Sequence, residues 1–443
     1  MPMLAGLTKS QLDAYWMPFT ANRQFKQDPR IITAADGCYF TDAEGRKVFD
    51  GLSGLWTCGL GHKVEAISRA IAAQVRTLDY SPAFQYGHPK AFELAERITE
   101  FMPGDLNRVF FCDSGSEAAD TALKIARGYW RKAGRPEKTR LIGRAKGYHG
   151  VNFGGISVGG IGGNRAIFGE GVSADHLRHT WLKDNYFSRG QPDHGAHLAD
   201  ELTEILALHD ASNVAAVIVE PLAGSAGVFP PPTGYLQRLR EICTANNVLL
   251  IFDEVICAFG RMGARTGAEA FGVVPDMMTI AKQVTNGAVP MGAVIVNQSI
   301  HDCFMRTDAP DYVLEMPHGY TYSGHPLACA AGLASLDVLE RESAIERVRE
   351  NAVVFEEALH SLANCPHVVD IRNFGLAGGL TLESYDGEPL RRPFEVAMDL
   401  WQKGFYVRYG GDTVQLGPPF VSSKEEINRL VDALGESLAS NAR

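Results

Sequence analysis

The sequence predicts an α/β protein in which a buried, mostly parallel sheet is covered by helices on both faces. Short apolar runs alternate along the middle of the chain with amphipathic helical patterns, and this alternation is typical of a parallel sheet. The runs are continuously apolar, as expected for strands that are buried on both sides. A chain of 443 residues is long enough for a large core and a second, smaller domain.

Six apolar runs are predicted to form the strands of this sheet. They are RVFFC (108–112), TRLIGR (139–144), VAAVIVEP (214–221), NVLLIFDE (247–254), MMTIAK (277–282) and GAVIVN (292–297). A helix is predicted after the first run, because its apolar residues share one helical face. These residues stand at positions 119, 122, 123, 126, 129 and 130. Gly134 and Pro136 follow them and are expected to end the helix.

The two ends of the chain are predicted to form a smaller α+β domain together. The C-terminal part contains the short strand-like runs VVDIRNF, GLTLE, FYVRYG and TVQLG. A closing helix is expected after the capping box that joins Ser423 to Glu426. Near the N-terminus, GCYFTDAEGRKVFDG resembles a hairpin. We therefore expect an N-terminal segment (1–60) that contributes to the small domain, a large domain (61–325) and a C-terminal small domain (326–443).

Composition and charge exclude several classes of protein. The net charge of -10 leaves no basic surface for nucleic acid or for anionic membranes. Residues 1–20 lack a basic head followed by an apolar run, so no secretory signal is expected. No stretch approaches the roughly 18 apolar residues of a membrane span. We expect a soluble, cytoplasmic protein that has neither nucleic-acid nor membrane partners.

The cysteines indicate neither a metal site nor a disulfide framework. Eight cysteines are scattered without a CxxC pair or a Cys/His cluster at zinc spacing. Cys38 and Cys58 could form a bridge in principle, but reduced thiols are the simpler expectation for a cytosolic protein. Motifs such as HExxH and GxGxxG are also absent. We therefore expect no metal ion.

Two charged residues end neighbouring apolar runs, where α/β sheets bind ligands. Lys282 ends one of these runs, and a partly desolvated lysine has a lowered pKa and can attack a carbonyl as the free amine. A single lysine is more often a solvated loop residue. Asp253 ends another run, and it could keep a pyridinium nitrogen protonated or simply cap the following turn. Glu254 would point the other way and is assigned a structural role.

A third candidate is the turn that opens the predicted helix, Ser114-Gly115-Ser116-Glu117. Free N–H groups at a helix start bind phosphate, and glycine allows the backbone to approach closely. An ordinary N-cap is the more common explanation of such a turn by itself. A helix start that binds anions, a strand-end aspartate and a strand-end lysine together describe one ligand, a phosphorylated pyridine aldehyde.

Almost the whole chain resembles the class III (fold type I) pyridoxal-phosphate (PLP) aminotransferases. The motifs are SGSEA (114–118), GYHG (147–150), VIVEPLAGSAG (217–227), LLIFDEV (249–255), TIAKQVTNGAVPMGA (279–293) and GYTYSGHPLACAAG (319–332). Four further stretches resemble the omega-amino acid:pyruvate, or beta-alanine:pyruvate, branch. These are YWMPFT (15–20), LSGLWTCGLGH (52–62), DEVICAFGRMG (253–263) and VRYGGDTVQLGPPF (407–420). The resemblance implies a large PLP-binding domain and a smaller domain from both termini.

The resemblance also implies roles for residues around the cofactor ring. Lys282 would attach the cofactor covalently and later move the proton. Asp253 would pair with the pyridine nitrogen, Val255 would pack on one ring face and Tyr148 on the other. Glu220 would orient its neighbours without reacting.

The phosphate and the substrate would be bound by a second group of residues. Gly115 and Ser116 would hold the phosphate, and Thr321 would reach the phosphate of the neighbouring subunit. The catalytic unit would then be a homodimer, or a dimer of dimers. Arg408 would bind the substrate carboxylate in a bidentate fork. Phe19, Trp56 and Phe84 would form the aromatic lining, with Phe84 supplied across the dimer.

Two departures from the wider family favour pyruvate over 2-oxoglutarate as the amino acceptor. Enzymes that act on ornithine or 4-aminobutyrate carry Gln after the DEV motif, where this chain has Ile256. Their arginine near the C-terminal Pro-Pro pair is absent, and Gln415 occupies that stretch. The expected reaction transfers an amino group to pyruvate from an omega-amino acid or a primary amine, such as a donor that resembles beta-alanine. Products would be alanine and an aldehyde, ketone or oxo acid.

Several alternatives remain at this point. The donor could be taurine, or the reaction could be that of an aminomutase or a decarboxylase, because fold does not decide chemistry. Gly155–Gly159 matches the GxSxG elbow of hydrolases, but further glycines follow, so no helix is expected to start there. A non-catalytic binding protein would not need both Lys282 and Asp253. Donor preference, stereopreference and movement of Arg408 stay open.

Overall fold

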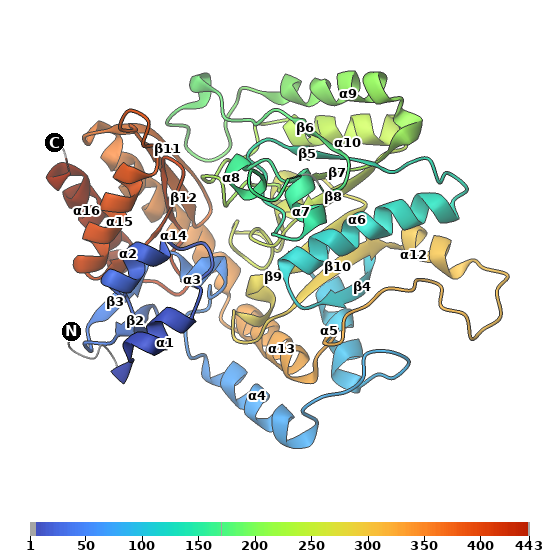
Figure 1. Ribbon diagram of the computed structural model, residues 1–443, viewed down its shortest axis with the longest axis horizontal. Helices are drawn as coiled ribbons and strands as arrows, with labels where there is room; N and C mark the ends of the chain where they lie inside the picture. Colours follow the sequence, from blue (N-terminus) through green and yellow to red (C-terminus); the bar gives the residue numbers. More distant parts are fainter. Residues whose placement is uncertain (1–5, 170, 442–443) are drawn as a thin grey trace.

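The chain folds into a larger body around a central sheet and a smaller body that contains both ends of the chain. The computed structural model describes residues 6–169 and 171–441. The first five residues of the N-terminal stretch discussed above lie outside this description. Figure 1 shows the N-terminal and C-terminal elements together on one side and the central sheet with its helices on the other.

The central sheet has seven strands in the order β4-β10-β9-β8-β7-β5-β6. They are β4 (Leu106–Cys112), β5 (Arg140–Arg144), β6 (Ala174–Leu177), β7 (Val214–Val219), β8 (Leu249–Asp253), β9 (Met277–Ala281) and β10 (Gly292–Asn297). All six predicted runs form strands, and the pairs among β5 to β9 are parallel. The edge strand β6 was not predicted, because its sequence ADHL has no apolar run.

One strand of this sheet is antiparallel to its neighbours. β10 pairs antiparallel with both β9 and β4. The connection from β9 to β10 contains only a short 3-10 turn (Lys282–Thr285) and a loop. A parallel partner needs a crossover of a dozen or more residues, so this short connection returns the chain beside β9 in the opposite direction.

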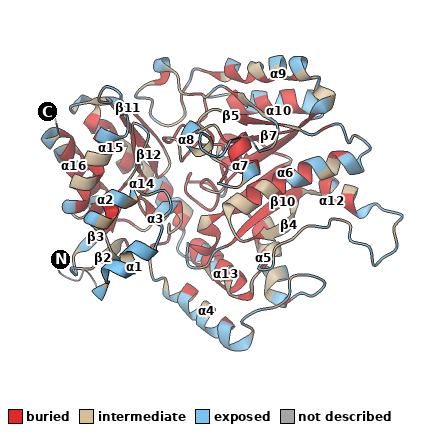
Figure 2. Ribbon diagram, in the orientation of Figure 1, coloured by how far each residue is buried: buried red, intermediate tan, exposed pale blue. Residues whose placement is uncertain are grey.

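The inner strands of the sheet are buried on both faces, as the continuous apolar runs predicted, whereas most residues of the edge strands β4 and β6 are partly exposed. Along β7, Val217 and Val219 belong to one hydrophobic cluster, and Ala216 and Ile218 belong to the other. The helix α6 (Gly115–Lys132) contributes to the second cluster, and α10 (Tyr235–Ala245) contributes to the first. Figure 2 shows inner strands such as β7 and β10 as buried and the outer surfaces of helices such as α4 and α9 as exposed.

The predicted helix after the first strand is confirmed as α6. Ser114 is its N-cap, and the Ser114 side chain accepts a hydrogen bond from the Glu117 backbone N–H. The helix ends at Lys132, two residues before Gly134, whose φ is 77°. The helix begins shortly after the end of β4 and lies against β9 and β10.

The two chain ends form two four-stranded sheets. The first, β1-β2-β3-β13, contains β1 (Ile32–Asp36), the predicted hairpin β2 (Tyr39–Asp42) and β3 (Lys47–Asp50), and β13 (Phe405–Tyr406). β13 pairs parallel with β3, so one sheet joins both ends of the chain. The second, β11-β12-β15-β14, contains β11 (Val368–Phe374), β12 (Ala377–Leu382), β14 (Arg408–Gly410) and β15 (Thr413–Leu416).

One C-terminal prediction needs correction. FYVRYG is two strands in different sheets, not one, because the chain crosses from the first sheet to the second at the buried Val407. The closing helix α16 (Lys424–Ser440) has the predicted capping box between Ser423 and Glu426. The proposed domain limits at 60/61 and 325/326 remain predictions.

The other helices cover these sheets and connect them. They are α1 (Lys9–Ala14), α2 (Asn22–Gln27), α3 (Ser53–Trp56), α4 (Glu65–Thr77), α5 (Pro89–Thr99), α7 (Phe153–Val158), α8 (Gly162–Arg165), α9 (Glu201–His209), α11 (Gly267–Phe271), α12 (Gln298–Met305), α13 (Pro326–Arg341), α14 (Ala344–His360) and α15 (Arg391–Gln402). None of the helices in the described residues is long and apolar enough to cross a membrane. All eight cysteines, including Cys38 and Cys58, are free.

At Gly143 in β5 the backbone of a helix lies so close to the sheet that there is no space for a side chain. A Cβ atom at Gly143 would overlap the backbone carbonyl oxygen of Val158 at the end of α7. Backbone cannot be displaced as easily as a side chain, so Gly143→Ala is expected to lower the free energy of unfolding by about 3 kcal/mol. Gly163→Ala is the control, because a Cβ there meets no atom within 4 Å. Equal unfolding midpoints in urea for the two variants would contradict the prediction.

Candidate active site

Lys282 lies immediately after β9 and begins the 3-10 turn Lys282–Thr285. Its φ of 53° is unusual for a residue with a side chain, and such backbone strain is concentrated at functional sites. Burial lowers the pKa of Lys282 to about 8, against the opposing effect of the carboxylates of Asp253 and Glu220. Its Nζ has no hydrogen bond or ion pair to any residue that the structure describes. The amine is therefore available to react near neutral pH.

Asp253 ends β8, the strand next to β9, and is paired in register with Thr279. Its Oδ2 lies 2.8 Å from Nδ1 of His149, and its Oδ1 accepts a hydrogen bond from the Val255 N–H at 3.2 Å. His149 is 1% exposed. The imidazole and the backbone therefore hold the carboxylate of Asp253 in one orientation.

The role of His149 is a feature that sequence reasoning missed. The residue belongs to the GYHG motif, beside Tyr148, but no role was assigned to it. Its Nε2 is buried and has no hydrogen-bond partner among the described residues. The carboxylate oxygen of Asp253 faces Nδ1, so Nδ1 is the ring nitrogen that is placed to donate in this contact. A buried histidine next to a predicted site residue was the available indication.

Glu220 follows β7 and connects two loops through their backbones. Its Oε1 accepts a hydrogen bond from the Tyr148 N–H at 2.9 Å, and its Oε2 accepts one from the Gly224 N–H at 3.0 Å. Burial raises the pKa of this carboxyl. These contacts agree with a residue that orients its neighbours.

Tyr148 lies among charged groups of the same region. Burial raises the pKa of its phenol, and Arg408, Asp253 and Glu220 are all close enough to affect that pKa electrostatically. Lys282 has the same three neighbours among the groups that affect its pKa. The structure thus brings Lys282, Asp253, Glu220, Tyr148 and Arg408 together, although they are far apart in the chain.

The start of α6 lies beside the end of β9. A Cβ atom at Gly115 would be 3.1 Å from Cγ1 of Val255 and 3.7 Å from Cβ of Ala281. The Oγ of Ser116 accepts a hydrogen bond from the Val151 N–H at 3.1 Å. Because the first N–H groups of a helix have no partner within the helix, this end of α6 can bind an anion next to Lys282.

Arg408 begins β14 and is half-buried. Its guanidinium makes no hydrogen bond or ion pair with the residues that the structure describes. Most other partly buried arginines here are paired, as Arg240 is with Asp276. An unpaired guanidinium close to Lys282 is suited to bind a carboxylate from a substrate.

For the remaining predicted residues, the contacts described here do not involve the Lys282 cluster. Trp56 is 4% exposed, and the Arg261 guanidinium lies 5.6 Å from its ring centroid. Phe19 and Phe84 are 65% and 56% exposed. Thr321 is also exposed, and its carbonyl accepts a hydrogen bond from the Tyr80 hydroxyl. Their contributions to the site remain predictions.

Two other sequence interpretations can be judged from the structure. Glu254 accepts hydrogen bonds from the N–H groups of Gly267 and Ala268 at the start of α11, which confirms its structural role. The GxSxG match lies within and after α7, and α8 does begin at Gly162, so the expectation that no helix follows was wrong. Ser157 is nevertheless no exposed nucleophile, because its Oγ donates to Phe153 and accepts from the Val172 N–H.

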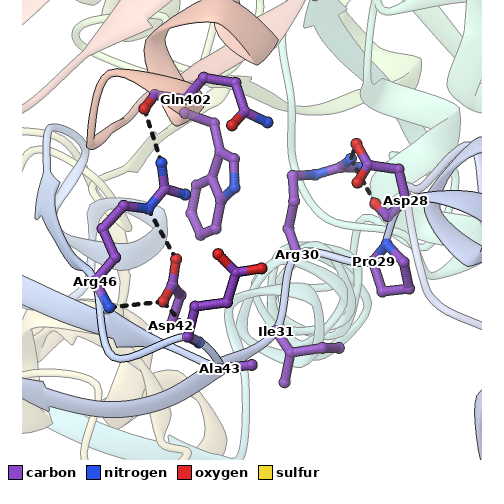
Figure 3. Close-up of a pocket in the computed structure, with 10 residues that line it drawn as sticks. Asp28, Pro29, Arg30, Ile31, Asp42, Ala43, Arg46 and Gln402 are labelled. Atoms are coloured by element: carbon purple, nitrogen blue, oxygen red, sulfur yellow. Dashed lines mark hydrogen bonds and ion pairs between the residues drawn. The ribbon is translucent and has the colours of Figure 1, made fainter. Parts of the chain in front are cut away.

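A surface hollow elsewhere in the molecule is structural. Figure 3 shows it between the N-terminal segment and the end of α15, with none of the predicted site residues in its lining. Arg46 donates to Asp42 Oδ2 at 2.9 Å and to the Gln402 carbonyl at 2.8 Å, above the Trp401 ring. These Arg46 contacts join the two ends of the chain. Within residues 6–169 and 171–441, no group of three or more acidic, histidine or cysteine side chains is placed to hold a metal ion.

Comparison with known proteins agrees with this arrangement. The model of the family "Aminotransferase class-III" matches residues 20–438. The chain is 60% identical to the beta-alanine–pyruvate aminotransferase of Pseudomonas aeruginosa over 96% of both chains. It is 58% identical to the omega-amino acid–pyruvate aminotransferase of Pseudomonas putida over 99% of both chains.

Solved structures show the same fold. An amine transaminase from an uncultivated Pseudomonas species, in its PLP-bound form, has a TM-score of 0.90 at 35% identity and covers 97% of this chain and 99% of its own. An (S)-enantioselective omega-transaminase from Thermomicrobium roseum has a TM-score of 0.92 at 30% identity, over 98% of both chains. With its strand-end lysine, strand-end aspartate and full-length similarity, this chain belongs to the class III aminotransferases and has their α/β fold.

Proposed function

We propose that the protein is a PLP-dependent aminotransferase with pyruvate as its amino acceptor. The amino donor is an omega-amino acid or a primary amine that resembles beta-alanine. The observation that carries this proposal is the position of Lys282, Asp253 and the start of α6 at one edge of the sheet. The printed activities of the relatives with 60% and 58% identity support the same donor and acceptor.

The residues present fit the cofactor. The N–H groups of Gly115 and Ser116, which have no acceptor among the described residues, would hold its phosphate, and Asp253 would pair with its ring nitrogen. Val255, which is in contact range of Gly115, and Tyr148 would cover the two faces of the ring. Bound PLP supplies an electron sink for the carbon that loses its proton.

Each polar residue then has a defined task. Lys282 would hold the cofactor through Nζ, and the same Nζ would take a proton from the substrate carbon and return one. The Asp253 carboxylate would keep a proton on the cofactor's ring nitrogen, and the 2.8 Å contact with His149 fixes the orientation of that carboxylate. Glu220 keeps the Tyr148 and Gly224 loops in place.

Arg408 would bind the pyruvate carboxylate. The side chain of Ile256 fills the space beside Gly224, where a Cβ atom would lie 2.5 Å from its Cδ1. An apolar residue there adds no polar partner for a second carboxylate, which supports pyruvate over 2-oxoglutarate. Trp56, Phe19 and Phe84 would line the site for apolar donors.

A homodimer is the proposed working form, with Phe84 and Thr321 acting on the partner's site. Their exposure on the single chain is consistent with this arrangement. Sedimentation velocity at assay concentration tests it, and a fully active monomer would contradict it. Cytoplasmic location remains a prediction.

The visible spectrum tests the proposed reaction. The purified protein should be yellow, should lose the band when beta-alanine or 1-phenylethylamine is added, and should regain it with pyruvate. The donor that bleaches faster is the better substrate, and taurine belongs in the same series. A band that no amine bleaches would favour an aminomutase or a decarboxylase. Absence of a band after addition of PLP would contradict the role of Lys282.

Arg408→Ala is expected to raise the KM for pyruvate about 100-fold, because a bidentate, charge-assisted pair is lost. The half-reaction with 1-phenylethylamine, which has no carboxylate, should change about twofold or less. Steady-state and single-turnover kinetics provide the two values. Arg131→Ala, on the exposed last turn of α6, controls for the loss of a positive charge. Equal losses with both substrates would contradict the role of Arg408.

A further inference from the structure

Arg408 and Gln415 are direct partners across two strands. β14 and β15 are antiparallel, and Arg408 is opposite Gln415 in their register. Side chains of opposite residues in such a pair project from the same face of the sheet, with Cβ atoms roughly 4.5–5.5 Å apart. The Gln415 side chain therefore lies within reach of the arginine proposed to bind the substrate.

Gln415 contributes an acceptor that has no donor. The residue has an exposed fraction of 0%, and its Nε2 donates to the Ser225 carbonyl at 2.8 Å. Because a carbonyl only accepts, this contact determines which end of the amide is nitrogen. The other end, Oε1, is buried and has no hydrogen-bond partner among the described residues. Buried acceptors are rarely left without a donor, so we expect a donor to reach Oε1 in another state of the site.

Arg408 contributes donors that have no acceptor. A guanidinium has five N–H donors, and a bidentate carboxylate uses two of them. The residues that the structure describes accept none of these five. The same strand pair therefore places an unpaired neutral acceptor opposite an unpaired cation.

We propose that Gln415 is a positioning residue whose Oε1 accepts a hydrogen bond from Arg408 while the guanidinium binds the substrate carboxylate. This inference rests on the proposed function, since it assumes that Arg408 binds the carboxylate. A neutral amide orients the guanidinium without cancelling its charge, whereas a carboxylate at this position would compete with the substrate. The link from Nε2 to Ser225 anchors the amide to the loop that follows Glu220.

The test is Gln415→Met, which keeps the length of the side chain and removes the acceptor. The KM for pyruvate is expected to rise about tenfold, as for the loss of a hydrogen bond to a charged group. kcat at saturating pyruvate and the half-reaction with 1-phenylethylamine should each change by about twofold or less. A loss shared equally by pyruvate and 1-phenylethylamine would indicate a merely structural role and overturn the proposal. Gln402→Met, at an exposed glutamine of α15, is the matched control.

A double-mutant cycle separates positioning from general damage. In the Arg408→Ala background, Gln415→Met should change the pyruvate KM by about twofold or less, because the partner is already missing. A tenfold increase in both backgrounds would overturn the proposal. If Arg408→Ala itself leaves the pyruvate KM unchanged, the proposed function fails. If Arg408→Ala raises it and Gln415→Met does not, only the positioning role fails.

If Gln415→Met does not fold, a second variant can test whether Gln415 positions Arg408. Gln415→Glu has nearly the same shape, but its charge competes with the substrate for Arg408. The pyruvate KM should rise more than about tenfold, while 1-phenylethylamine is still accepted. An unchanged pyruvate KM in a folded Gln415→Glu protein would show that the position-415 side chain does not reach Arg408.

Discussion

Replacing Lys282 with alanine is expected to lower kcat for amino transfer from beta-alanine to pyruvate by at least about 10,000-fold, the upper range for loss of a positioned acid or base. In the proposed reaction the amine would act as nucleophile and as proton carrier, and no other lysine is proposed to do either. Burial, which lowers the pKa of Lys282 to about 8, keeps part of the amine uncharged at neutral pH. The yellow band of a covalently attached cofactor should be lost as well.

The measurement compares kcat of Lys282→Ala with that of Lys132→Ala. Lys132 is exposed at the end of α6, so its replacement should leave kcat unchanged within about twofold. A small primary amine in the buffer should restore part of the activity of Lys282→Ala, because it can carry the proton. Retention of more than about one hundredth of the wild-type kcat without such an amine would be incompatible with the assigned role.

Replacing Asp253 with asparagine is expected to lower kcat about 1,000-fold. Asparagine preserves the shape and can still bond to His149, but it has no charge to hold a proton on the cofactor nitrogen. Loss of one preorganised electrostatic contact costs about 100- to 1,000-fold in rate, and the buried, fixed position of Asp253 favours the upper end. Pre-steady-state kinetics with beta-alanine would show that the slowed step is proton removal.

Glu254 provides the matched control, because it is adjacent in sequence and also buried. Burial raises the pKa of Glu254 to about 7, and its two oxygens accept from backbone N–H groups of α11. Glu254→Gln should lower the unfolding midpoint but preserve kcat per folded molecule. A kcat loss below about tenfold in Asp253→Asn, or an equal loss in Glu254→Gln, would contradict the division of roles.

Much of the architecture follows from local patterns. Continuous apolar runs identified six of the seven central strands because burial on both faces demands apolar side chains at every position. The same runs placed Lys282 and Asp253 at strand ends, and the capping residues located the starts of α6 and α16. The seventh strand, β6, was not predicted because it is short, polar and at the edge of the sheet.

What the sequence by itself determined was therefore the fold class and the strand-end positions of the two candidate residues, Lys282 and Asp253, since both depend on periodicity, strand ends and motifs that lie within a few residues of one another. Only the tertiary structure decided the pairing of His149 with Asp253, the bridging by Glu220, the reversal of β10 and the division of FYVRYG between two sheets. The placement of Gln415 opposite Arg408 belongs with these. Such contacts join segments far apart in the chain, and their geometry is set by packing of the whole molecule.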